Sequence, residues 1–202
     1  SGSTGKPKGV VRDNTHAVAL QWTMDHFMGV QPGETYWAAS DIGWVVGHSY
    51  ICYAPLLHGC TTVLYEGKPV GTPDAAEYWR VIEKHKVAAM FTAPTALRAI
   101  RKVDAETKLA KGHDLRSLRC VFVAGERCDP DTLDHFRCAL NVPVIDNWWQ
   151  TETGSPIAGF VPVEVGTKSG STALPLPGFD VRCLSAATGE ELPHGTLGSL
   201  AA

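Results

Sequence analysis

Between residues 30 and 150, short apolar runs alternate with longer segments of helical pattern, and this alternation limits the possible folds. Val87–Thr92 has the apolar, bounded composition of a buried strand. Pro94–Val103 follows it with proline at its start and basic residues near its end, as helices prefer. Strands that alternate with helices form parallel sheets covered by those helices. We therefore expect an α/β fold, a mostly parallel sheet with flanking helices.

The same patterns place the other elements along the chain. Expected helices cover Thr15–Met28, Gly47–Leu57, Pro73–Lys86, Pro94–Val103 and Pro130–Leu140. Expected strands cover Thr35–Ala39, Thr61–Tyr65, Val87–Thr92, Arg119–Ala124, Val142–Ile145, Asp180–Leu184 and Thr196–Leu200.

The composition changes beyond about residue 155, where Gly, Ser, Thr and Pro become frequent. We expect residues 1–155 to form an α/β subdomain. Residues 156–202 are expected to be a partial, truncated β-rich subdomain, and the whole chain an internal fragment of a longer protein.

Charge and cysteine usage exclude several classes of protein. A formal net charge of −3 gives no broad cationic field for nucleic acid or anionic lipid. No apolar run reaches transmembrane length, and no targeting segment is apparent within the chain. The six cysteines form no C-x-x-C pair, which favours reduced, buried thiols in a reducing compartment.

The chain begins with a glycine- and hydroxyl-rich loop, Ser1–Val10, that carries two lysines. Free backbone N–H groups, hydroxyls and ammonium groups are what a polyphosphate needs. The loop is not a Walker A motif, because only two residues separate Gly2 from Gly5 and a proline follows Lys6. The alternative is a flexible terminal linker. The lysines and the apolar residues that follow them argue against that alternative.

A second motif, Asp146–Gly154, places two adjacent tryptophans beside acids, an amide and two threonines. It follows an expected buried strand, and ligand groups in open α/β sheets lie past the carboxyl ends of strands. The alternative is a tryptophan-rich core corner with a polar turn.

Together these segments resemble the AMP-forming acyl-CoA synthetases of the acyl-adenylate-forming superfamily. Val123–Arg127 resembles the family's adenine-stacking turn, and Ser40–Tyr50 its acyl- and CoA-facing segment. The matches occur in family order over essentially the whole chain. The closest likeness is to the short-chain branch, which contains the propionyl-CoA and acetyl-CoA synthetases.

The resemblance implies a ligase that activates a short-chain carboxylate with ATP to an acyl-adenylate, with residues 1–155 as its nucleotide- and acyl-binding subdomain. Transfer of the acyl group to CoA then releases AMP, pyrophosphate having left in the first step. The resemblance implies ATP and CoA as co-substrates and Mg²⁺ as cofactor. It implies only small-molecule partners. The implied compartment is the bacterial cytoplasm or the mitochondrial matrix.

The resemblance also implies residue roles. Lys6 and Lys8 would neutralise the outer phosphates, Thr151 would reach the α-phosphate, and Asp146 would accept from the adenine amino group. The implied catalytic residues are Thr4, Lys6, Thr151 and Glu152, of which Thr4 and Glu152 would also hold Mg²⁺. The implied nucleotide-binding residues are Ser1, Gly2, Ser3, Gly5, Lys8, Gly9, Gly125, Glu126, Arg127, Asp146, Asn147, Trp148, Trp149 and Gln150.

For the acyl group, the resemblance implies a small pocket formed by Trp44, Val45, Val46 and Trp149. Val46 stands where acetate enzymes typically have threonine, which favours propionate; the alternative is a neutral exchange of threonine for valine. Arg127 departs from those enzymes, which usually carry proline there. Each of the two acids also has a non-functional interpretation. Glu126 could be a surface acid that pairs with a nearby arginine. Glu152 could be a solvated loop acid.

The sequence alone leaves two other functions open. One is an adenylation domain that loads a different acyl acceptor. The other is a non-catalytic nucleotide-binding module. The family's ribose-binding aspartate and adenylation lysine would lie past Ala202, so we expect residues 1–202 alone to be catalytically inactive.

Overall fold

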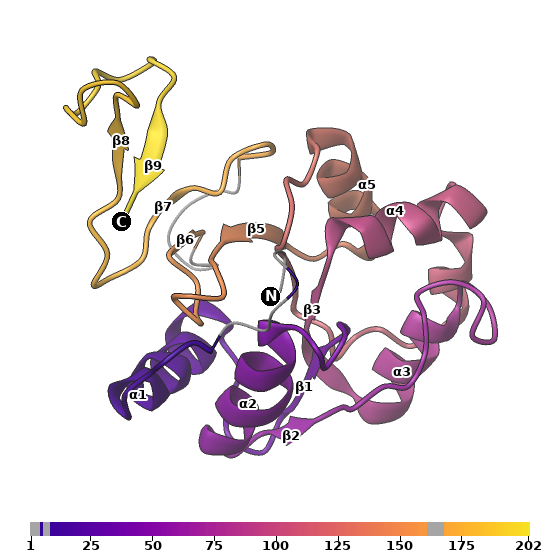
Figure 1. Ribbon diagram of the computed structural model, residues 1–202. Coiled ribbons are helices and arrows are strands. Elements are labelled where there is room, and N and C mark those ends of the chain that lie inside the picture. Colours follow the sequence, from indigo (N-terminus) through magenta and orange to yellow (C-terminus); the bar gives the residue numbers. More distant parts are fainter. Residues whose placement is uncertain (1–4, 6–8, 161–167) are drawn as a thin grey trace.

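The structure is a computed structural model that describes residue 5 and residues 9–160 and 168–202. A seven-stranded sheet has the order β2-β1-β3-β4-β5-β6-β7 (Figure 1). Its first five strands are parallel, whereas β6 and β7 are antiparallel to their neighbours. The strands are β1 Thr35–Ala38, β2 Thr61–Thr62, β3 Val87–Thr92, β4 Cys120–Val123, β5 Val144–Trp148, β6 Ala158–Gly159 and β7 Leu174–Pro175.

Helices cover both faces of the sheet, so the fold is α/β with three layers (Figure 1). On one face lie α1 Thr15–Trp22, the π-helix η1 Thr23–Phe27, the π-helix η2 Gly47–Tyr53 and α2 Ala54–Leu57. On the other face lie α3 Glu77–His85, α4 Pro94–Val103 and α5 Pro130–Leu140, with the 3₁₀ helix η3 Lys108–Gly112 nearby.

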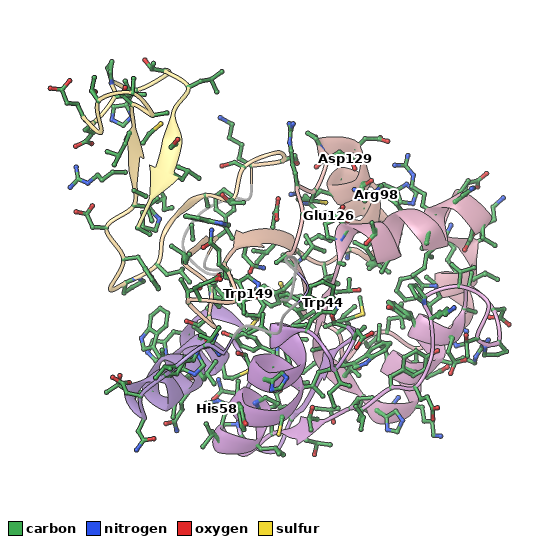
Figure 2. All side chains as sticks on the ribbon, viewed as in Figure 1. Trp44, His58, Arg98, Glu126, Asp129 and Trp149 are labelled. Atoms are coloured by element: carbon green, nitrogen blue, oxygen red, sulfur yellow. The ribbon has the colours of Figure 1, made fainter. Side chains whose placement is uncertain are left out.

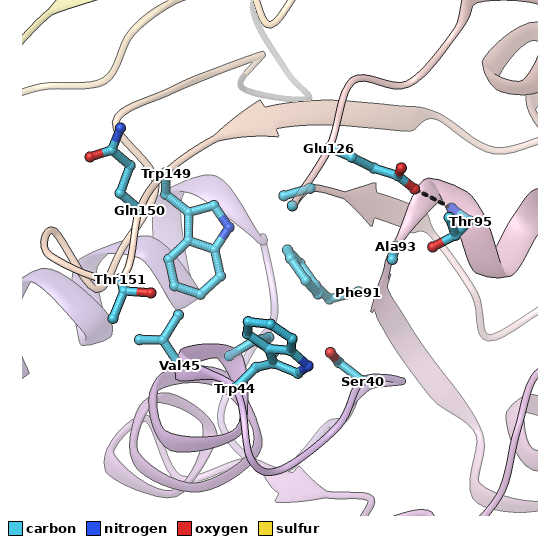
Figure 3. A pocket seen from close by; sticks show the side chains of 13 residues that line it. Ser40, Trp44, Val45, Phe91, Ala93, Thr95, Glu126, Trp149, Gln150 and Thr151 are labelled. Atoms are coloured by element: carbon cyan, nitrogen blue, oxygen red, sulfur yellow. Dashed lines mark hydrogen bonds between the residues drawn. The ribbon is translucent and has the colours of Figure 1, made fainter. Parts of the chain in front are cut away.

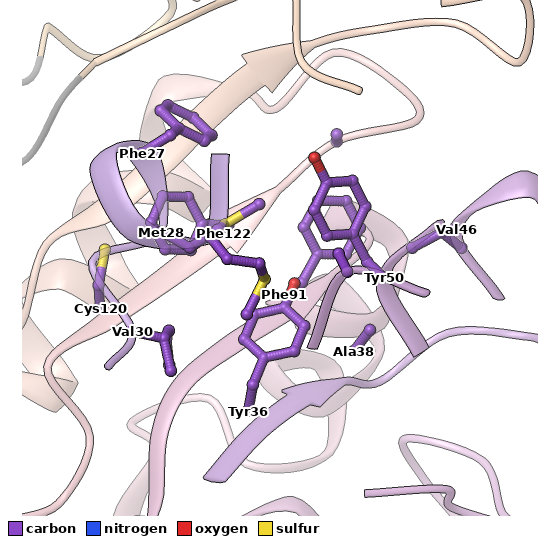
Figure 4. Close-up of a cluster of buried hydrophobic side chains, with 14 of the residues drawn as sticks. Phe27, Met28, Val30, Tyr36, Ala38, Val46, Tyr50, Phe91, Cys120 and Phe122 are labelled. Carbon is purple, nitrogen blue, oxygen red and sulfur yellow. The ribbon is translucent and has the colours of Figure 1, made fainter. Parts of the chain in front are cut away.

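Two buried clusters, one on each face, hold these layers together. Strand residues alternate between them, because successive side chains of a strand point to opposite faces. In β4, Phe122 joins the first cluster under α1 and η2, whereas Val121 and Val123 join the second under α3, α4 and α5. Figure 4 shows part of the first cluster, in which Phe27, Tyr36, Phe91 and Phe122 are drawn.

Most elements agree with the sequence prediction. The strand Val87–Thr92 and the helices Pro94–Val103 and Pro130–Leu140 have the predicted bounds. The predicted helices near residues 15–28 and 47–57 are present, but each contains a π-helical segment that the pattern did not predict. The helix expected from Pro73 begins at Glu77, and the strand expected over Thr61–Tyr65 ends at Thr62.

Strand β5 was predicted too short, because the polar residues Asp146 and Asn147 were placed after its end. Both are buried, and Asn147 pairs with Gly159 of β6. Its amide nitrogen also donates to the carbonyl oxygen of Val123, at 3.0 Å. The sheet therefore supplies partners that let polar residues continue the strand.

The last part of the chain forms a two-stranded antiparallel sheet of β8 Arg182–Leu184 and β9 Ser199–Ala201. This sheet stands apart from the seven-stranded sheet in Figure 1. Strands β6 and β7, which also follow residue 155, belong to the larger sheet. The subdomain boundary at residue 155 stays a prediction.

All six cysteines are free thiols, as the sequence predicted. Cys60, Cys120 and Cys128 are buried, but Cys52 and Cys138 are exposed, so the prediction of buried thiols was wrong for these two. None of the helices in the described ranges is long and apolar enough to cross a membrane.

Candidate functional site

A cavity of about 510 Å³ opens at the carboxyl end of the parallel strands (Figure 3). Segments that follow β1, β3, β4 and β5 all contribute to it, because parallel strands bring their carboxyl ends to one edge. Its lining residues are Ser40, Trp44, Val45, Val46, Phe91, Ala93, Thr95, Ala124, Gly125, Glu126, Trp149, Gln150 and Thr151.

The cavity brings together residues from three of the predicted segments. The implied acyl-pocket residues and part of the implied nucleotide set line one space: Trp44, Val45, Val46, Gly125, Glu126, Trp149, Gln150 and Thr151. Four other predicted nucleotide or magnesium residues do not line the cavity. Asn147 and Trp148 belong to β5, whereas Arg127 and Glu152 are exposed. Gly5 and Gly9 are exposed as well. The predicted roles of Ser1, Gly2, Ser3, Thr4, Lys6 and Lys8 fall outside the described residues.

The apolar part of the cavity lies between two tryptophans (Figure 3). Trp44 comes from the loop between β1 and η2 and is 62% exposed. Trp149 follows β5 and packs against the first buried cluster, which also contains Val46. The cavity thus has one solvent-exposed wall and one wall anchored in the core.

Gly47 fixes the loop that carries Trp44, Val45 and Val46. A Cβ atom at this position would overlap the backbone of Ile42. The loop therefore folds back closely over the first turn of η2, which only glycine permits. Asp41 closes the start of the loop by accepting a hydrogen bond from the backbone N–H of Gly43, at 2.7 Å.

The turn after β4 is held by Arg98 of α4 (Figure 2). Oε1 of Glu126 accepts hydrogen bonds from the backbone N–H of Thr95 (2.7 Å) and from Arg98 (2.8 Å). Arg98 also reaches Oδ2 of Asp129 at 3.2 Å, while Oδ1 of Asp129 caps α5 through the N–H of Thr132. Gly125 has φ +97, which favours glycine. One arginine thus ties the turn to two helices.

Asp146 is the one carboxyl group of the motif that is buried, at 4% exposure. Burial raises the pKa of Asp146 to about 6, and hydrogen bonds from the backbone N–H groups of Cys128 and Asn147 partly oppose this. Oδ1 of the neighbouring Asn147 is buried with no hydrogen-bond partner among the described residues. Asp146 does not line the cavity.

The segment that leaves the opening loop lies against the Thr151–Gly154 segment. Arg12 donates a hydrogen bond to the carbonyl oxygen of Thr151. Gly154 has φ +70, and a Cβ there would overlap the side chains of Arg12 and His16. The two ends of this contact are 139 residues apart in sequence. Arg12, four residues beyond Lys8, is therefore placed beside the predicted magnesium segment.

Sequence reasoning missed Arg12, Arg98, Tyr50 and Phe91, which hold or line the site. Arg98 sits on a predicted helix, but only the fold brings that helix beside the turn after β4. Tyr50 ends the predicted acyl- and CoA-facing segment Ser40–Tyr50, and Phe91 lies in the predicted strand Val87–Thr92, but neither residue was given a role of its own. Arg12 lies two residues beyond the opening loop Ser1–Val10, and this position is the signal in the sequence that could have identified it.

The residues present are compatible with a magnesium ion that is held mainly by phosphates. Within the described ranges no group of three or more His, Cys, Asp or Glu side chains could hold a metal ion by itself. Mg²⁺ commonly uses one or two carboxylates together with substrate phosphates and water. Glu152 is an exposed carboxylate next to Thr151, which lines the cavity.

Comparison with known proteins adds independent evidence. The sequence model of the "AMP-binding enzyme" family matches residues 1–202. Acyl-CoA synthetase short-chain family member 3, mitochondrial, from Mus musculus is 58% identical over 185 residues, covering 91% of this chain and 26% of that protein. Propionate–CoA ligase from Escherichia coli (strain K12) is 48% identical over 193 residues, covering 94% of this chain and 30% of that protein.

A solved structure agrees with the sequence comparisons. The crystal structure of the Brucella canis acyl-CoA synthetase superposes with a TM-score of 0.84 at 30% identity, covering 98% of this chain and 35% of that one. The chain thus spans less than a third of the length of the two curated relatives it matches here, 26% and 30%.

Proposed function

The chain belongs to the AMP-binding enzyme family, and from that premise we propose that it is part of a short-chain acyl-CoA synthetase. The proposed reaction activates propionate, with acetate as the next best acid, by attack of the carboxylate on the α-phosphorus of ATP. Pyrophosphate leaves and an acyl-adenylate forms. The thiol of CoA then attacks the acyl carbon, the thioester forms, and AMP leaves.

One observation carries this proposal: a single cavity joins an apolar pocket to residues expected to face a nucleotide. Trp44, Val45 and Trp149 give the apolar part, while the Gly125–Glu126 turn and Thr151 give the polar part. An acyl-adenylate has the same division, a small apolar acyl group joined to a nucleotide. Preorganised polar groups beside a reacting phosphate are the main source of catalysis in phosphoryl-centre chemistry.

The proposed nucleotide contacts are those that the family resemblance implies, and they are supported for Gly125, Glu126 and Thr151, which line the cavity, but not for Arg127 and Asp146, which do not. The Gly125–Arg127 turn would lie along the purine, and Asp146 would accept from its amino group. The Thr151 hydroxyl would bind an α-phosphate oxygen, with the Thr151 backbone held by Arg12. Lys6 and Lys8 remain the residues that we propose for the outer phosphates.

For Mg²⁺, we propose that Glu152 and Thr4 hold the ion together with phosphate oxygens. When bound, the ion would offset the negative charge of the phosphates. The exposed position of Glu152 next to Thr151 supports its part in this site.

The preference for propionate rests on Val46, which is 6% exposed and presents methyl groups where a threonine would present a hydroxyl. An apolar pocket discriminates one methylene by about 1–3 kcal/mol, so acetate should remain a weaker substrate. A bacterial cytoplasm or a mitochondrial matrix would suit the proposed enzyme, since the similar proteins include a bacterial and a mitochondrial one.

The test uses the natural protein that contains this chain. Straight-chain acids from acetate to octanoate are supplied with ATP, Mg²⁺ and CoA, and pyrophosphate and AMP release are measured. We expect kcat/KM to be highest for propionate and both products to form in equal amounts. Activity only with octanoate, or pyrophosphate release that is independent of CoA and carboxylate, would contradict the proposal.

A further inference from the structure

Two aromatic rings, Tyr50 and Phe91, contact Trp149 on the core side of the cavity, and Phe91 also lines the cavity. The Trp149 ring meets the Tyr50 ring edge to face, with centroids 5.4 Å apart and an interplanar angle of 88°. It meets Phe91 in the same way, at 6.1 Å and 80°. Tyr50 and Phe91 are in turn stacked on each other, at 6.3 Å and 10°. Edge-to-face contacts of this kind favour one orientation of the ring.

Tyr50 is itself fixed at its far end. The ring is fully buried, with 0% exposure, in the first buried cluster (Figure 4). Its Oη lies 2.7 Å from Oγ1 of Thr23. The Thr23 hydroxyl donates its only proton to the carbonyl oxygen of Leu20, at 2.8 Å, so Tyr50 is the donor to Thr23. Tyr50 and Thr23 both belong to π-helical segments, η2 and η1, which are often found at functional sites.

Trp149 has no comparable anchor of its own. In the described part of the chain its indole makes no side-chain hydrogen bond, and packing against the first buried cluster, with the Tyr50 and Phe91 rings in edge-to-face contact, holds it in place. On its other side the indole faces the cavity across from Trp44 (Figure 3). Tyr50 is the nearer of the two rings that contact the indole, at 5.4 Å against 6.1 Å for Phe91.

We propose that Tyr50 is a positioning residue that limits the length of the acyl group by holding Trp149 in place. The inference rests on the proposed function, since it concerns the acid that enters the same cavity. Replacing Tyr50 by a smaller aliphatic residue leaves space behind the indole. The indole can then tilt away from the cavity, and longer acids fit.

The experiment compares Tyr50→Leu with two other variants in the natural protein that contains this chain. Tyr50→Phe keeps the ring that contacts Trp149. Tyr36→Leu is the matched control, because Tyr36 is also 0% exposed in the same cluster but makes no ring contact with Trp149 among the described residues. For each, kcat/KM is measured with propionate and hexanoate, using pyrophosphate release.

For Tyr50→Leu we expect the hexanoate-to-propionate ratio of kcat/KM to rise roughly tenfold or more, since a methylene changes discrimination by that order. The gain should come mainly through a lower KM for hexanoate. Tyr50→Phe and Tyr36→Leu should keep the parent ratio. Tyr50→Met, which fills more of the vacated volume, replaces Tyr50→Leu where the latter is not recovered folded.

Each outcome decides a different question. An unchanged ratio in Tyr50→Leu, with an active parent protein, overturns the role of Tyr50 and leaves the proposed function intact. An equal shift in Tyr50→Leu and Tyr36→Leu also overturns it, because the effect then belongs to a loosened core. A parent protein that releases pyrophosphate with none of the acids removes both the proposed function and this inference.

Discussion

At the scale of single residues, Asp146 illustrates how the fold changes the chemistry of a recognised motif. The sequence places this acid in a ligand-binding motif, but its burial in β5 depends on neighbours that are distant in sequence. The backbone N–H of Cys128 reaches its carboxyl group from the turn after β4. A sequence pattern identifies such a residue, whereas only the packed sheet sets its pKa.

The raised pKa of Asp146 makes stability depend on pH. Its pKa rises from 3.8 in the unfolded chain to about 6 in the fold, so the folded state favours the neutral carboxyl group. The resulting stabilisation is complete below pH 3.8 and is lost as the pH rises through 6. A shift of this size corresponds to roughly 3 kcal/mol.

The variant Asp146→Asn keeps the shape of the side chain and cannot ionise. We expect it to become more stable than the parent as the pH rises from 4 to 7.5, by up to roughly 3 kcal/mol. Urea unfolding at several pH values measures the difference. Glu106→Gln, at an exposed acid, should follow the parent throughout. Parallel pH curves for Asp146→Asn and the parent would argue against the raised pKa.

At the scale of elements, the sequence predicted correctly those helices and strands whose bounds are set by their own residues. The strand Val87–Thr92 is apolar on both faces, and the helix Pro94–Val103 has proline at its start, so both were predicted with their observed bounds. The extension of β5 beyond Ile145 to Trp148 was missed because the partners of Asn147, which are Val123 and Gly159, come from other strands. The π-helical segments were missed because apolar periodicity does not distinguish them from α-helix.

The contact between α4 and the turn after β4 leads to a prediction about nucleotide binding. Arg98→Met removes the cation that holds Glu126 and Asp129. We expect the KM for ATP to rise by roughly three- to tenfold, with kcat for propionate little changed. Stability should fall by less than about 1 kcal/mol, since partly exposed ion pairs contribute little.

Arg101 offers a matched control on the same helix. It pairs with Asp131 of α5 at 2.7 Å and also joins α4 to α5, and among the described residues no hydrogen bond or ion pair links it to the turn after β4. Arg101→Met should lower the melting temperature by a similar amount without changing the KM for ATP. Arg98→Lys, which keeps the charge, should restore part of the affinity. Equal KM values in Arg98→Met and Arg101→Met would rule out a positioning role for Arg98.

At the scale of the whole molecule, the sequence predicted the α/β fold and a ligand-binding position for the Asp146–Gly154 motif just past the end of a strand. Motif order was informative because parallel strands bring the segments that follow them to the same edge. The structure adds the cavity that Trp44, Glu126 and Trp149 share. Sequence spacing could not supply it, because its walls come from four separate strand ends.

The exposure of this cavity leads to a prediction for residues 1–202 produced alone. Trp44, a lining residue, is 62% exposed, so water reaches the place where an acyl-adenylate would form. Adenylate chemistry needs a site from which water is excluded, since reactive intermediates otherwise hydrolyse. The matched relatives are more than three times as long as the shared region, 26–30% of their length. Further chain in such proteins would provide the cover.

We therefore expect residues 1–202 alone to give no propionate-dependent exchange of pyrophosphate into ATP, whereas the natural protein that contains them does. Circular dichroism on the same preparation establishes that the helices are formed, so that loss of folding does not account for the result. Glu152→Gln in the natural protein gives the background rate, because it removes the carboxylate proposed for Mg²⁺. Exchange by the isolated residues above that background would mean that the cavity completes the first half-reaction without any further cover.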